Sequence, residues 1–132
     1  MRHPSATLWE DKLKRVFDRI DSHLEDKYGS MYPLHPARPE RGTTSNPEAD
    51  GLFNVGAVFS AGFGSEFGPG YVVETRMSTL SRVPNQVRHE IENEVISILK
   101  KELVNEFPGR QLDIVRDGSV FKIYGDLSLG MV

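Results

Sequence analysis

The stretch that decides the fold is Phe53–Phe63, with the sequence FNVGAVFSAGF. Apolar residues occupy every second position in it, and small, mostly polar residues lie between them. A period of two is typical of a β-strand with one buried and one exposed face. The side that carries Phe53, Phe59 and Phe63 is therefore predicted to face the core.

A second strand is predicted directly after this one. The glycine-rich segment 64–70 (GSEFGPG) indicates a flexible loop, and residues 71–80 (YVVETRMSTL) are rich in β-branched and aromatic residues. Together the two strands are expected to form a long antiparallel hairpin. The glycine spacing does not match a dinucleotide-binding fingerprint, and no helix follows that could hold a phosphate.

Two amphipathic helices are predicted to flank this hairpin. Apolar residues recur at helical spacing over residues 9–24 and again over residues 87–103. Thr7 stands three residues before Glu10, the spacing of a capping box, which indicates where the first helix starts. The opposite face of that helix is predicted to be solvated, and its charged residues are Glu10, Asp11, Lys14, Arg15, Asp18, Asp21 and Glu25.

A second hairpin is predicted around Asp117-Gly118, the dipeptide that two-residue hairpin turns prefer. A turn at these two positions sets Val115 opposite Val120 and Asp113 opposite Lys122. The apolar face of the hairpin then comprises Leu112, Ile114, Phe121 and Ile123. Asp113 and Lys122 become a cross-strand pair of opposite charge on the other face.

The order helix, hairpin, helix, hairpin favours an α+β fold. The simplest packing has two layers, a four-stranded antiparallel sheet with both helices on its apolar face. We expect residues 1–132 to form a single domain, because this length lies in the usual range for one. Residues 29–51 show no periodicity and hold four of the eight prolines, so a non-regular, proline-rich loop is predicted there.

The composition narrows the class of protein. Sixteen basic and 19 acidic residues give a net charge of −3, which disfavours a nucleic-acid partner. No signal-peptide core and no membrane-length apolar run is present, so a cytoplasmic protein without a membrane partner is expected. The absence of cysteine excludes disulfides, thiolate catalysis and Cys-ligated metals.

The loop at 29–51 carries the first candidate site. Its prolines at 33, 36 and 39 repeat every three residues, and His35, Arg38 and Arg41 share that period. Polyproline II has three residues per turn, so in that conformation the three basic side chains would line one edge. Guanidinium groups bind carboxylate or phosphate, which suggests a small anion or an SH3-type protein partner. The alternative is a stiff, solvated loop whose arginines cover apolar surface.

The outer face of the sheet is the second candidate. Its polar residues include Glu74, Arg76, Asp113, Lys122 and Tyr124. Mixed charges over glycine-bearing strands suit a polar ligand or a face where two copies of the chain meet. The alternative is an ordinary water-facing surface on which charges pair weakly.

No catalytic motif is present. His89-Glu90 resembles the start of a zinc-binding His-Glu-x-x-His helix, but the fifth position is Asn93, so no metal is predicted. No cofactor is predicted either. The leading hypothesis is therefore a non-enzymatic module that binds a protein partner or itself, since a long first strand invites edge pairing. The alternative is a small enzyme or phosphometabolite-binding protein that uses His35, Arg38 and Arg41.

Overall fold

The computed structural model describes residues 4–62, 64–118 and 120–125. Two long helices and four strands alternate along the chain as the sequence predicts, which confirms the α+β class. The elements are α1 (Pro4–Tyr28), the 3-10 turn η1 (Pro47–Ala49), β1 (Phe53–Ser60), β2 (Gly70–Met77), α2 (Asn85–Glu106), β3 (Leu112–Asp117) and β4 (Val120–Gly125). Because α1 starts at Pro4, Thr7 lies inside the helix, and the predicted capping box is wrong.

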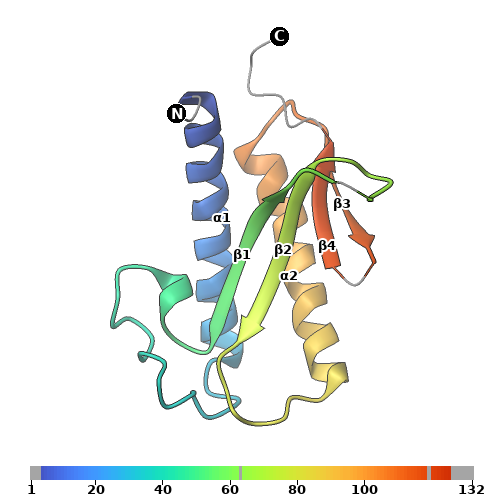
Figure 1. Cartoon of the computed structure of the whole chain (residues 1–132). Coiled ribbons are helices and arrows are strands. Elements are labelled where there is room, and N and C mark those ends of the chain that lie inside the picture. Colours follow the sequence, from blue (N-terminus) through green and yellow to red (C-terminus); the bar gives the residue numbers. More distant parts are fainter. Residues whose placement is uncertain (1–3, 63, 119, 126–132) are drawn as a thin grey trace.

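The four strands form one antiparallel sheet in the order β1-β2-β4-β3. Both helices lie on the same face of it, as Figure 1 shows. The strands β1 and β3 are therefore the edges of the sheet. The pairing of β2 with β4 covers only Tyr71–Val73, so the second half of β2 extends past the neighbouring strand.

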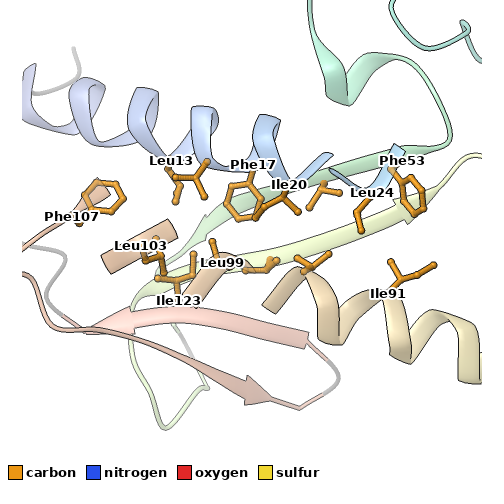
Figure 2. Packing of buried hydrophobic residues seen from close by; sticks show 14 of the residues in the cluster. Leu13, Phe17, Ile20, Leu24, Phe53, Ile91, Leu99, Leu103, Phe107 and Ile123 are labelled. Carbon is orange, nitrogen blue, oxygen red and sulfur yellow. The ribbon is translucent and has the colours of Figure 1, made fainter. Parts of the chain in front are cut away.

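The core lies between the helices and the sheet, and Figure 2 shows the apolar stripes of α1 and α2 meeting across it. Phe53 is fully buried there. Phe59 is 57% exposed, so the prediction that it faces the core is wrong. Its strand is an edge strand that ends at Ser60, and its ring contacts Tyr71 edge-on, at 5.6 Å between centroids. Phe63 lies outside the described residues.

The register of the second hairpin differs from the prediction. Asp117 pairs with Val120 and Val115 pairs with Lys122, so Asp117 belongs to the ladder and the turn begins one residue later than predicted. Each partner on β4 moves by two residues, which leaves the predicted apolar face intact. Asp113 lies opposite Tyr124, so the predicted Asp113–Lys122 pair does not form. Asp117 takes the place of Asp113, because its carboxylate bonds to Lys122.

Candidate functional site at the edges of the sheet

The loop at 29–51 is held together by one guanidinium group. Arg38 donates hydrogen bonds to the backbone carbonyls of Glu48 (2.5 Å), Gly51 (3.0 Å), Asp50 (3.1 Å) and Phe53 (3.2 Å). These acceptors lie in the turn η1, in the segment that follows it and at the start of β1. The Arg38 side chain thus ties the end of the loop to the edge of the sheet.

The other two predicted anion-binding residues have partners of their own. Arg41 pairs with Asp26 at 2.7 Å and donates to the carbonyl of Ser22 at 3.4 Å, so it lies against α1. The Nδ1 atom of His35 accepts a hydrogen bond from the amide of Ala37 at 3.0 Å. Among the described residues, no partner is shared by the three side chains. An anion site at these residues stays a prediction.

Two buried carboxylates on α1 were missed by the sequence prediction, which placed them on a solvated face. Asp21 is 1% exposed and Glu25 is also buried. Glu25 Oε1 accepts a hydrogen bond from the backbone amide of Phe53 at 2.7 Å, and Asp21 accepts one from the amide of Val55. Both residues lie in the helical row directly beside the apolar stripe, which is the signal that could have found them.

The match between these two elements has a simple geometric origin. Asp21 and Glu25 are one helical turn apart, a rise of about 5.4–6 Å. Phe53 and Val55 are two strand residues apart, a distance of about 6.6–6.8 Å. Successive carboxylates of α1 can therefore reach successive outward-facing amides of β1. The helix covers the first half of this sheet edge in the way that a neighbouring strand would.

Burial has a clear electrostatic consequence for Asp21. It raises the pKa of Asp21 to about 7, the Glu25 carboxylate adds to the shift, and the hydrogen bond from Val55 opposes it. Burial also raises the pKa of Glu25, against the hydrogen bond from the Phe53 amide. The Oδ2 atom of Asp21 is buried and has no hydrogen-bond partner among the described residues. Asp21 therefore changes between its neutral and ionised forms near neutral pH.

The second half of the β1 edge is not covered in this way. Val58 and Phe59 are about 60% exposed there. A cavity of about 250 Å³ opens between α1 and this part of β1, and its lining includes Leu13, Phe17 and Ala57. An unpaired strand edge beside exposed apolar side chains is a typical place for a further strand to pair.

The outer face of the sheet is partly covered by the glycine-rich loop. Lys122, predicted to lie on an open surface, is 2% exposed. Its Nζ atom donates to Gly68 O (2.6 Å), Ser65 Oγ (3.1 Å) and Asp117 Oδ2 (3.4 Å). Ser65 also donates to Asp117 at 2.6 Å. The loop predicted to be flexible is thus fastened over β4 by a buried lysine.

The remaining residues of that predicted surface are more accessible. Arg76 pairs with Glu74 at 3.1 Å, and both side chains reach solvent. Asp113 is exposed on the edge strand β3. The ring of Tyr124 lies against Phe67 of the loop, with 5.2 Å between centroids. The loop therefore divides the outer face into a covered part over β4 and an exposed part over β2.

Within residues 4–62, 64–118 and 120–125, no group of three or more histidine, aspartate or glutamate side chains is placed to hold a metal ion. No helix in this part of the chain is long and apolar enough to cross a membrane.

Comparison with known proteins shows the family. A family model described as "Uncharacterised protein" matches residues 4–125. The chain belongs to this family. A similar protein from Borreliella burgdorferi, described as "Uncharacterized protein", is 40% identical over 117 residues, which are 89% of this chain and 91% of the relative. No solved structure matches the chain. The function of this family member is therefore inferred from its geometry.

Proposed function

We propose that this protein is a non-enzymatic module that self-associates through the second half of β1. The observation that carries the proposal is the contrast between the two halves of that edge. The first half is occupied by Asp21 and Glu25. In the second half, no described residue hydrogen-bonds to the backbone groups that point away from β2, and Val58 and Phe59 are exposed.

The direction of the backbone groups follows from the strand geometry. The amides of Phe53 and Val55 point away from β2, since carboxylates of α1 accept their hydrogen bonds. Backbone direction repeats every second residue in a strand, so the N–H and C=O groups of Ala57 and Phe59 also point outward. No described residue outside the strand hydrogen-bonds to these groups.

A second copy of the chain fits this edge by symmetry. A two-fold axis beside Val58 would place Ala57 of each copy opposite Phe59 of the other. Antiparallel pairing at these two positions makes about four hydrogen bonds between the copies and joins the two sheets into one. The exposed apolar side chains would be covered at the same time. The contact is short, so a weak, concentration-dependent dimer is expected.

A proline substitution at the edge tests this proposal. Ala57→Pro removes the outward donor at the centre of the contact, while the ladder between β1 and β2 keeps its hydrogen bonds. Two hydrogen bonds are lost per dimer at about 0.7–1 kcal/mol each, so sedimentation equilibrium should show association weakened about ten- to thirtyfold. Circular dichroism checks that the variant is folded.

The matched control is Thr75→Pro, which removes a backbone donor from the side of β2 that faces away from β1. This variant should dimerise like the wild type. The proposal is refuted if the wild type is strictly monomeric across micromolar to millimolar concentrations. Equal association of wild type and Ala57→Pro would place the contact elsewhere.

A further inference from the structure

The second half of β2 borders a notch in the sheet. Pairing with β4 stops at Val73, and the residues Glu74–Met77 continue beyond it. In Figure 1 the β3–β4 hairpin lies beside only the first part of β2, and α2 lies behind the remainder. The end of β2 therefore has no neighbouring described strand on the side that faces away from β1, and there is room for one further strand there.

Two residues of β2 direct their backbone into this notch. Odd-numbered residues of β2 face away from β1, because their cross-strand partners on β1 are the outward-facing odd residues. Tyr71 and Val73 use this side to pair with β4. Thr75 and Met77 have the same orientation, and no described residue outside the strand hydrogen-bonds to their backbone groups. The notch thus presents the hydrogen-bonding pattern of an open sheet edge.

A cavity lies between this edge and α2. It has a volume of about 270 Å³, and its apolar floor is formed by Val73, Val95, Ile96, Val120 and Phe121. A smaller cavity continues it along the helix, past Met77 and Ile91. Pockets for whole drug-sized ligands are larger, about 300–1,000 Å³, so this space suits one side chain of an extended segment.

The charge beside the cavity selects the kind of segment. Arg76 and Glu74 beside the larger cavity pair with each other, and Arg88 beside the smaller one is exposed to solvent. Glu92 borders both cavities and is half-buried. It makes no ion pair with a described residue, whereas Glu94 on the same helix is bonded to His23 and Lys27. Burying a carboxylate further without a partner is costly, so an occupant of the groove is favoured if it brings a cation.

We infer that this groove binds an extended peptide segment of a partner protein with the pattern apolar–x–basic. The segment adds to the edge at Thr75 and Met77 as a short strand. Its apolar side chain fills the cavity over Val95 and Phe121. Side chains on one face of a strand alternate, so the basic residue two positions away lies on the same side and reaches Glu92. This site is separate from the self-association edge of β1.

The test uses a labelled full-length chain and two synthetic probes. The first peptide is acetyl-Thr-Leu-Thr-Lys-Thr-amide, and the second has glutamate in place of lysine. Titration to about 1 mM of the lysine peptide should shift the NMR amide signals of Thr75 and Met77, with the glutamate peptide at least tenfold weaker. An absence of these shifts, or shifts centred on Ala57 and Phe59, would overturn the inference.

Two variants make the result specific. Thr75→Pro removes a ladder donor and should weaken binding of the lysine peptide about tenfold or more. Glu92→Lys lies on the helix surface, leaves the strand unchanged, and should reverse the preference toward the glutamate peptide. Equal binding of both peptides to Glu92→Lys would exclude the assigned role of this carboxylate. Ala57→Pro should bind the lysine peptide like the wild type, so this site can fail or succeed independently of dimerisation.

Discussion

Replacing Asp21 with asparagine should make the protein more stable at neutral and alkaline pH. The carboxyl group has an ordinary pKa of 3.8 and a pKa of about 7 in the folded chain. A raised folded-state pKa means that the folded protein binds a proton more tightly than the unfolded chain does. The stability that this proton supplies is fully present below pH ~4 and is lost as the pH rises through about 7.

The size of the effect follows from the shift. A difference of about three pH units at 1.36 kcal/mol per unit corresponds to roughly 4 kcal/mol between the neutral and ionised forms. An asparagine side chain cannot ionise, and its oxygen can still accept the hydrogen bond from Val55. Asp21→Asn should therefore match the wild type near pH 4 and exceed its stability by about 1–4 kcal/mol at pH 8.

Urea denaturation at a series of pH values between 4 and 8 measures this difference directly. The control is Asp11→Asn, which removes an exposed carboxylate from the same helix and should keep the wild-type pH dependence. Glu25 titrates in the same direction as Asp21, so some pH dependence should remain in Asp21→Asn. The reasoning is refuted if the gap between Asp21→Asn and the wild type does not widen as the pH rises.

Three further substitutions test the contacts that hold the edge and the loops. Glu25→Ala should lower the free energy of unfolding in urea by about 1–3 kcal/mol, because the buried Phe53 amide loses its acceptor. Glu25→Gln should retain most of the wild-type free energy of unfolding. Arg38→Lys should speed proteolysis of the loop at 29–51 severalfold, since an ammonium group cannot reach four carbonyls at once; an unchanged cleavage rate would contradict this assignment. Lys122→Met should raise amide exchange in residues 64–69 while the core stays protected, and uniform exchange changes would count against a local role.

The sequence predicted those parts of the fold that depend on periodicity. The stripes of α1 and α2 and the apolar face of the second hairpin follow directly from residue spacing. The exposure of Phe59 could not be predicted in this way. Alternation shows on which face of a strand a residue lies, but it does not show how far along the strand other elements cover that face. The position of the turn before Val120 was missed for another reason: Asp117 is drawn into the ladder by its bonds to Lys122 and Ser65.

The candidate surfaces depended on contacts between distant segments, which spacing does not reveal. Glu25 and Phe53 are 28 residues apart in the chain, and Lys122 and Gly68 are 54 apart. A charged residue is predicted to be solvated unless a specific partner is known. Arg38 shows the same difficulty, because its four acceptors are backbone carbonyls that have no signature in the sequence.

The half-covered edge of β1 carries a risk for the folded chain. Asp21 and Glu25 reach β1 from α1, whereas Arg38 reaches the carbonyl of Phe53 only while residues 29–51 stay in place. A cut in that segment would free the Phe53 carbonyl and so lengthen the unpaired strand edge that can template another molecule. Long unpaired strand edges can add further copies in an open-ended array instead of forming a closed dimer, and open-ended assembly of this kind is how fibrils begin.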